Sequence, residues 1–120
     1  MRVGIVGSRD CGSHLRRTQE ILAVLRAYGP GTVVVSGDCP TGIDMIAKRC
    51  AKALGLEYVG HPADWKRLGK RAGFARNGTI VADTDEGHAW WNGISRGTMD
   101  TVEKYKKAGK LVIVHRWEPK

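Results

Sequence analysis

A chain of 120 residues is long enough to bury one hydrophobic core, and the sequence predicts one domain over residues 1–120. Hydrophobic residues make up 42% of the chain, no run approaches the ~20 apolar residues of a membrane span, and no signal-peptide pattern precedes the first apolar run, so we expect a cytoplasmic protein without a membrane partner. The net charge of +8 favours an anionic partner, such as a phosphorylated small molecule, a nucleic acid or an acidic protein.

Strand-like and helix-like segments alternate along the chain. Residues 2–6 form an apolar run, residues 32–35 are rich in β-branched side chains, and residues 43–54 repeat apolar side chains at helical spacing. Strands are expected at 2–6, 32–35, 56–59, 88–91 and 111–114, and helices at 13–28, 43–54, 72–82 and 97–108, with a less regular segment at 60–70. The alternation predicts an α/β fold, a three-layer, doubly wound parallel sheet of about five strands joined by right-handed crossovers.

Three glycine-bearing turns each follow a predicted strand and precede a helix. They are Gly7-Ser8-Arg9, Ser36-Gly37-Asp38 and the segment from Gly93 to Thr98. In the strand order 3-2-1-4-5 these turns would be neighbours at the carboxyl edge of the sheet, where backbone N–H groups and helix N-termini gather around anionic ligands. Each alone could be an ordinary turn, but together they predict a small phosphate or nucleotide binder.

Three residues near these turns each allow two interpretations. Asp44 lies in the first turn of a predicted helix, where the helix dipole stabilises a carboxylate, or it accepts hydrogen bonds from ribose hydroxyls. Trp65 either packs within the protein or stacks on a base or at a dimer contact. Asn77 either orients a ligand hydroxyl or bonds the backbone.

The cysteines and histidines do not follow a metal-binding pattern. The chain has three cysteines, Cys11, Cys39 and Cys50, which cannot all form disulfides with one another. They include no CxxC arrangement, which indicates reduced thiols. Cys11, His14 and Cys39 could meet if the first two turns adjoin, but their spacing is not typical of a metal site. We expect no metal and no required cofactor.

Several motifs together resemble one family. They are Gly7-Ser8-Arg9, Ser36-Gly37 with Gly42-Ile43-Asp44, Ala63-Asp64-Trp65-Lys66, Gly69-Lys70, Ala72-Gly73 with Arg76-Asn77, and Gly93-Ile94-Ser95-Arg96-Gly97-Thr98. This succession spans nearly the whole chain and resembles the YspA-like branch of the SLOG superfamily. That superfamily is similar in fold to the LOG phosphoribohydrolases and to the Rossmann-like domain of the DNA-processing protein DprA.

The resemblance implies a Rossmann-like domain that binds a nucleotide or a nucleotide-derived ligand. Such a ligand would be a nucleoside phosphate, NAD or an ADP-ribose-like molecule, and the protein would act as a sensor or processing protein, as a homodimer or higher homo-oligomer. The residues assigned to the ligand are Gly7, Ser8, Arg9, Ser36, Gly37, Asp38, Gly42, Asp44, Trp65, Arg76, Asn77, Gly93, Ser95, Arg96, Gly97 and Thr98.

The resemblance also implies an alternative, a phosphoribohydrolase that cleaves the N-glycosidic bond of nucleoside 5′-monophosphates. LOG enzymes carry a glycine-threonine loop followed by a glutamate that acts at the ribose. Here Gly97-Thr98 keeps part of that frame, but Thr101 stands where the glutamate is expected and Asp100 is one position away. The candidate catalytic residues are Asp100, Asp44 and Arg76.

A second alternative is a DNA-binding protein of the DprA type, which the charge of +8 would suit. The basic residues fall on three predicted helices rather than in one run. The predicted helix 43–54 carries Lys48, Arg49 and Lys52. The segment just before the helix 72–82 carries Lys66, Arg67, Lys70 and Arg71, and the helix 97–108 with the residues after it carries Lys104, Lys106, Lys107 and Lys110. This spread is typical of several solvated faces, so the sequence favours the small ligand.

Overall fold

A computed structural model describes residues 1–118 and contains one parallel sheet. Its strands are β1 (Arg2–Gly7), β2 (Val33–Ser36), β3 (Glu57–Gly60), β4 (Glu86–Trp91) and β5 (Val112–Arg116). They pair in parallel in the order β3-β2-β1-β4-β5, which confirms the predicted fold class and strand order. Within the described part of the chain, no helix has the length and apolar character needed to cross a membrane.

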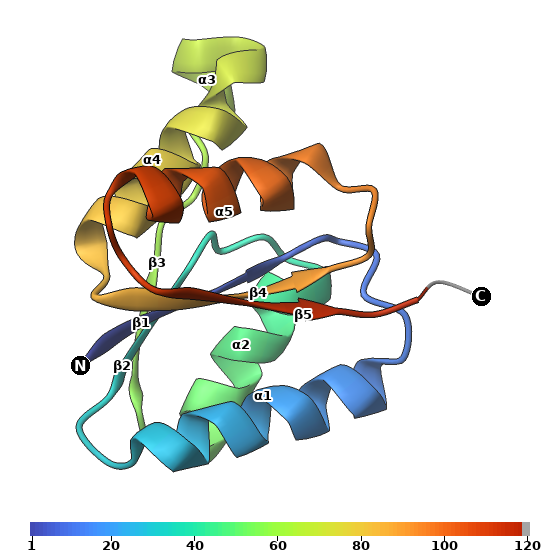
Figure 1. Cartoon of the computed structure of the whole chain (residues 1–120), viewed down its shortest axis with the longest axis vertical. Coiled ribbons are helices and arrows are strands. Elements are labelled where there is room, and N and C mark those ends of the chain that lie inside the picture. Colours follow the sequence, from blue (N-terminus) through green and yellow to red (C-terminus); the bar gives the residue numbers. More distant parts are fainter. Residues whose placement is uncertain (119–120) are drawn as a thin grey trace.

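Helices cover both faces of the sheet and give the molecule three layers (Figure 1). The helices are α1 (His14–Tyr28), α2 (Gly42–Ala53), α3 (Trp65–Leu68), α4 (Ala72–Asp83) and α5 (Arg96–Lys107), with the short 3-10 turn η1 (Gly69–Arg71) between α3 and α4. Helices α1 and α2 lie on one face and α4 and α5 on the other, while α3 stands beyond the end of α4, away from the sheet.

Each face of the sheet has its own hydrophobic core. On the face covered by α1 and α2, Ile5 and Trp90 of the sheet pack with Ile21 and Ile43 of the helices. On the other face, the core consists of Val6, Val35, Ile80, Ala89 and Val102. Full burial of one large apolar side chain contributes about 1.5–3 kcal/mol, so these two layers hold the ends of the strands in fixed positions.

The structure differs from the sequence prediction mainly in the segment 60–70. Residues that lack a helical repeat form α3 and then η1. Asp64, which precedes α3, caps it by accepting a hydrogen bond from the Arg67 N–H at 3.1 Å. A helix of 4 residues is too short to show a hydrophobic period, which explains why the sequence pattern missed it. Strand β5 also runs to Arg116, two residues beyond the expected end.

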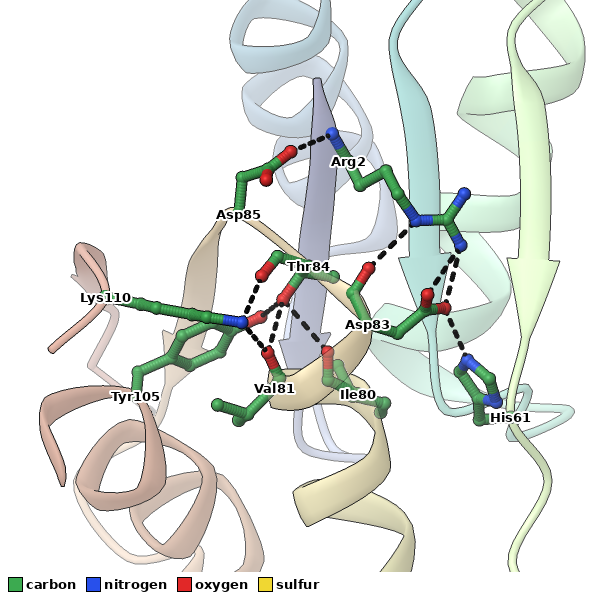
Figure 2. Close-up of polar contacts among 9 residues, drawn as sticks. All are labelled: Arg2, His61, Ile80, Val81, Asp83, Thr84, Asp85, Tyr105 and Lys110. Carbon is green, nitrogen blue, oxygen red and sulfur yellow. Dashed lines mark hydrogen bonds and ion pairs between the residues drawn. The ribbon is translucent and has the colours of Figure 1, made fainter. Parts of the chain in front are cut away.

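A polar cluster joins the end of α4 to the sheet (Figure 2). The Arg2 guanidinium donates to both carboxylate oxygens of Asp83 at 2.8 Å, and His61 Nε2 lies 2.8 Å from the same carboxylate. Burial raises the pKa of Asp83, but the hydrogen bonds from Arg2 and His61 bring that pKa below its ordinary value. Nearby, Lys110 Nζ donates to the carbonyls of Val81 and Thr84 at 2.8 and 2.7 Å, which satisfies the C-terminal end of the helix.

Candidate functional site

The carboxyl ends of β1, β2 and β4 open into a cleft of about 560 Å³. The register explains their meeting, because Gly7 at the end of β1 is level with Trp90 near the end of β4. All three glycine-bearing turns contribute to the cleft wall, and α3, η1 and α4 close it on the opposite side. Its volume is in the range of small-molecule sites, which is about 300–1,000 Å³.

The turn after β1 approaches α2 closely. A Cβ atom on Gly7 would lie 2.5 Å from Ile43 Cγ1 and 2.8 Å from the Trp90 carbonyl oxygen, so only glycine fits. The Ile43 N–H donates to the Ser8 carbonyl at 3.3 Å, and the Ser8 hydroxyl donates to the Asp10 carbonyl at 2.6 Å. These contacts hold the turn against α2, and the exposed Arg9 of the turn lines the cleft.

The buried carboxylate of Asp44 organises the turn after β2. Its Oδ1 accepts from the Ser36 hydroxyl at 2.9 Å, and its Oδ2 accepts from the Cys39 N–H at 3.2 Å. Burial raises the pKa of Asp44, while these two hydrogen bonds and the charge of Arg76 act in the opposite direction. Asp44 is 7% exposed, so its main contacts are with the loop that it shapes.

Arg76 and Asn77 of α4 connect the second turn to the start of α5. Arg76 Nη1 donates to the Gly37 carbonyl at 2.8 Å, and its Nε donates to Asn77 Oδ1 at 3.2 Å. Asn77 Nδ2 in turn donates to the Gly97 carbonyl and to Asp100 Oδ2, both at 3.2 Å. These bonds fix the guanidinium of Arg76 beside the cleft, with a positive charge facing the two turns.

The third turn forms the N-terminus of α5. Ser95 Oγ accepts from the Thr98 N–H at 3.3 Å and from the Thr98 hydroxyl at 3.0 Å. The N–H groups of Arg96 and Gly97 form no hydrogen bond with any residue from 1 to 118. Because the helix dipole is positive at this end, free N–H groups here suit the oxygens of an anion.

The wall formed by α3, η1 and α4 adds aromatic and basic side chains. Trp65 and Phe74 both line the cleft, yet they remain 51% and 49% exposed. Lys70, which lies between these two residues along the chain, also lines the cleft. The lining therefore carries three cationic side chains, those of Arg9, Lys70 and Arg76, against two carboxylates, and it combines them with exposed aromatic rings.

The structure gathers most of the residues predicted for the ligand. Those that line the cleft are Gly7, Ser8, Arg9, Gly37, Asp38, Asp44, Trp65, Arg76, Asn77, Ser95, Gly97 and Thr98. Four of the residues predicted for the ligand, and the candidate catalytic residue Asp100, are not part of the lining. Ser36 is fully buried beneath Asp44, Gly42 lies against the backbone of Arg9, Gly93 lies against the Arg116 side chain, Arg96 points to solvent at the start of α5, and Asp100 contacts Asn77 and Lys104.

Sequence reasoning missed several residues of the lining. Phe74 had no local signal, because a single aromatic residue on a predicted helix is ordinary. Thr101 lines the cleft and donates to the Gly97 carbonyl at 3.2 Å, while its neighbour Asp100 does not line it. All three cysteines are free thiols, and no cluster of three or more His, Cys, Asp or Glu that could hold a metal forms within residues 1–118.

Comparisons with known proteins agree with this fold. A model of the family described as YspA, cpYpsA-related SLOG matches residues 1–68. No curated protein matches the sequence. Among solved structures, DNA processing protein A (DprA) from Streptococcus pneumoniae is similar with a TM-score of 0.76 at 22% identity, over 94% of this chain and 49% of that protein, so the present chain spans about half of its length.

Two further structures share the fold. The molybdenum cofactor binding protein from the phototrophic bacterium Rippkaea orientalis has a TM-score of 0.75 at 20% identity, over 98% of this chain and 77% of that protein. DprA from Helicobacter pylori, described for its single-stranded DNA binding mode, has a TM-score of 0.70 at 20% identity, over 95% and 64%. The TM-scores show that these proteins share the fold of this chain, and at such low sequence identity the likeness shows the fold alone.

Proposed function

Because the chain belongs to the YspA, cpYpsA-related SLOG family, we propose that its cleft binds a nucleotide or a nucleotide-derived ligand. The observation that carries this proposal is the convergence of three turns, after β1, β2 and β4, around one cleft. In open α/β sheets, ligands bind at the carboxyl ends of the strands where the strand order reverses, and here that point lies between β1 and β4.

The chemistry of the lining supports a phosphorylated ligand at one part of the cleft. The unpaired N–H groups of Arg96 and Gly97 at the start of α5 can donate to phosphate oxygens. Arg76, held in place by Gly37 and Asn77, adds a guanidinium that suits two oxygens of one phosphate. Arg9 and Lys70 supply further positive charge.

Other parts of the lining support the nucleoside. Trp65 and Phe74 are half exposed at the cleft wall, where an aromatic ring can stack on a base. The carboxylate of Asp38 at the cleft is an acceptor for hydroxyl groups. A nucleoside phosphate, NAD or an ADP-ribose-like molecule combines these features, and we propose that the protein senses or processes such a molecule.

The lining supports binding more directly than glycosidic cleavage. Cleavage builds positive charge on the ribosyl carbon, which a carboxylate beside the cleft would stabilise. Asp100 forms an ion pair with Lys104 and is not part of the lining, and the buried Thr101 occupies the position next to it. We therefore propose ligand binding and assign no reaction to these residues.

The distribution of charge also supports a small ligand over a DNA strand. Helix α2, which carries Lys48, Arg49 and Lys52, covers the face of the sheet opposite to α4 and α5. The basic residues of η1 and α5 lie on the other side. Basic residues divided between helices on two faces of the sheet favour separate solvated surfaces over a single patch for a phosphate backbone.

A pair of substitutions at Gly97 tests the proposal. A Cβ atom there meets no heavy atom within 4 Å, so alanine fits without a clash and an aspartate side chain starts from open space. Gly97→Asp places a carboxylate among the free N–H groups, where it competes with a phosphate, whereas Gly97→Ala leaves them free. We expect wild type and Gly97→Ala to gain thermal stability with AMP, ADP-ribose or NAD, by about 2.7 kcal/mol at a ligand concentration of 100 times Kd, and Gly97→Asp to gain none.

Thermal-shift and calorimetric titrations of the three proteins provide the measurement. Far-ultraviolet circular dichroism of each protein without ligand controls for folding. The proposal is contradicted if none of the three nucleotides stabilises the wild-type protein, or if Gly97→Asp binds as tightly as Gly97→Ala.

A further inference from the structure

Asp38 at the carboxyl end of β2 adopts an unusual backbone conformation. Its φ is 57°, and it is the one residue other than glycine with a positive φ in the part of the chain that the structure describes. This left-handed backbone conformation costs a non-glycine residue on the order of 1–2 kcal/mol, a cost that glycine would not have.

The surrounding residues hold the Asp38 carboxylate at the cleft. The Tyr58 hydroxyl donates to Oδ1 at 3.3 Å, and the exposed Lys48 Nζ lies 3.8 Å from the same oxygen. A Cβ atom on Gly60 would lie 2.7 Å from Asp38 Cγ, so the glycine leaves the space that the carboxylate occupies. Burial raises the pKa of Tyr58, which keeps this phenol protonated as a donor.

One oxygen of Asp38 remains available. Oδ2 has no hydrogen-bond partner or ion pair among residues 1–118, and the side chain is 37% exposed and lines the cleft. The other carboxylate of the lining differs, since both oxygens of Asp44 already accept hydrogen bonds from Ser36 and Cys39. Of the two carboxylates, Asp38 is therefore the one that presents an unengaged acceptor to a ligand.

We propose that Asp38 accepts hydrogen bonds from the 2′- and 3′-hydroxyls of a ribose and makes the cleft selective for ribonucleotides with a free diol. This inference rests on the proposed nucleotide-binding function and names the class of nucleotide. In dinucleotide-binding sheets, the phosphate-binding turn follows the first strand, and a carboxylate further along the chain accepts a hydrogen bond from the ribose. A 2′-deoxynucleotide offers no 2′-donor, and a 2′-phosphate would repel the carboxylate.

Calorimetric titration of the full chain with AMP, 2′-deoxy-AMP and adenosine 2′,5′-bisphosphate tests this selectivity. A hydrogen bond to a charged acceptor corresponds to a factor of roughly 10 to 100 in affinity, so we expect wild type to bind AMP at least tenfold more tightly than either analogue. In Asp38→Gly, AMP should weaken to the level of 2′-deoxy-AMP. Since glycine adopts φ of 57° freely, this variant should fold at least as stably as wild type.

Asp64→Asn is the matched control. This carboxylate caps α3 and is not part of the cleft lining, so its loss should leave the preference for AMP unchanged. The inference is overturned if wild type binds AMP and 2′-deoxy-AMP equally, or if Asp38→Gly keeps the preference. If wild type binds AMP and 2′-deoxy-AMP equally but Gly97→Asp binds neither, the nucleotide site stands and only the role of Asp38 fails. If wild type binds neither nucleotide, both proposals fail.

Discussion

Single glycines in this protein have different structural duties, and contact geometry separates them. Gly7 lies where β1 passes α2, and any added Cβ would meet both Ile43 and the backbone oxygen of Trp90. Backbone atoms cannot move aside without displacing β4. Gly97, in contrast, faces open space at the start of α5. The first glycine is required for packing, while the second leaves the amides of the α5 N-terminus accessible.

We therefore expect Gly7→Ala to lower the free energy of unfolding by about 1–3 kcal/mol, because the added methyl group overfills the space between β1, β4 and α2. Gly97→Ala should change this free energy by less than about 1 kcal/mol and in the stabilising direction, since alanine is the better helix former. Urea denaturation of both variants measures the difference. Equal effects of the two substitutions would contradict the assignment.

At the scale of the helices, two serines start two elements with different relations to the cleft. Ser13 accepts from the Arg16 N–H at 3.2 Å and begins α1, and Ser95 accepts from the Thr98 N–H at 3.3 Å and begins α5. Ser95 lines the cleft between the three turns, whereas Ser13 lies outside it. The two caps are thus matched in structure and differ in their position relative to the proposed ligand.

Ser13→Ala and Ser95→Ala should each lower the free energy of unfolding by roughly 1 kcal/mol, because each removes the acceptor for one N–H of a first helical turn. Only Ser95→Ala should also weaken AMP binding, since it loosens the helix N-terminus that we propose contacts the phosphate. Urea denaturation and calorimetric titration provide the two measurements. A similar loss of affinity in both variants would indicate a general effect of stability and argue against a specific role for α5.

At the scale of the whole molecule, a partly buried chain of polar side chains joins α1, β4 and β5 on the face away from α4 and α5. The Tyr28 hydroxyl donates to Glu86 and lies 2.7 Å from His88 Nε2, and His88 Nδ1 lies 2.8 Å from His115 Nε2. Because the tyrosine proton goes to Glu86, we infer that His88 Nε2 carries a hydrogen and that Nδ1 accepts from His115. Burial and the nearby His115 lower the pKa of His88 to about 4, and burial lowers the pKa of His115.

Acid should therefore destabilise the fold through these histidines. Their pKa values in the folded state lie below the ordinary 6.5, so the unfolded chain binds more protons as the pH falls from about 6.5 towards 4. Stability that is present above pH 6.5 is lost in this window, by roughly 2–3 kcal/mol for His88. We expect the loss between pH 7 and 4.5, measured by urea denaturation, to be smaller in His88→Leu than in wild type.

His14→Gln serves as the control for this pH dependence, because His14 is exposed and lies outside this polar chain. The comparison uses the difference in slope, so the absolute stability that His88→Leu loses by disrupting its neighbours does not affect it. An identical pH dependence in wild type and His88→Leu would contradict the lowered pKa of His88 in the folded protein.

Much of the candidate site was predictable because strand ends and turns are local features. The runs before Gly7 and Ser36 mark where two strands end, and parallel pairing brings such ends to one edge of the sheet. The wall opposite was not predictable in the same way. Lys70 lines the cleft because α3 and η1 bring the chain to it, and segments this short have no periodic signal. Phe74 lies on the predicted helix α4, where a single aromatic residue gives no signal of a site.

The amino-acid sequence by itself determined the alternation of strands and helices, the three turns and the family resemblance, since hydrophobic period and glycine placement act over a few residues. Only the tertiary structure decided which side chains face the cleft. Asp100 and Asp44 were both candidate catalytic carboxylates in the sequence. In the structure Asp100 forms an ion pair with Lys104, and Asp44 accepts a hydrogen bond from Ser36. Asp38 keeps an unengaged oxygen because distant residues, Tyr58 and Gly60, position it.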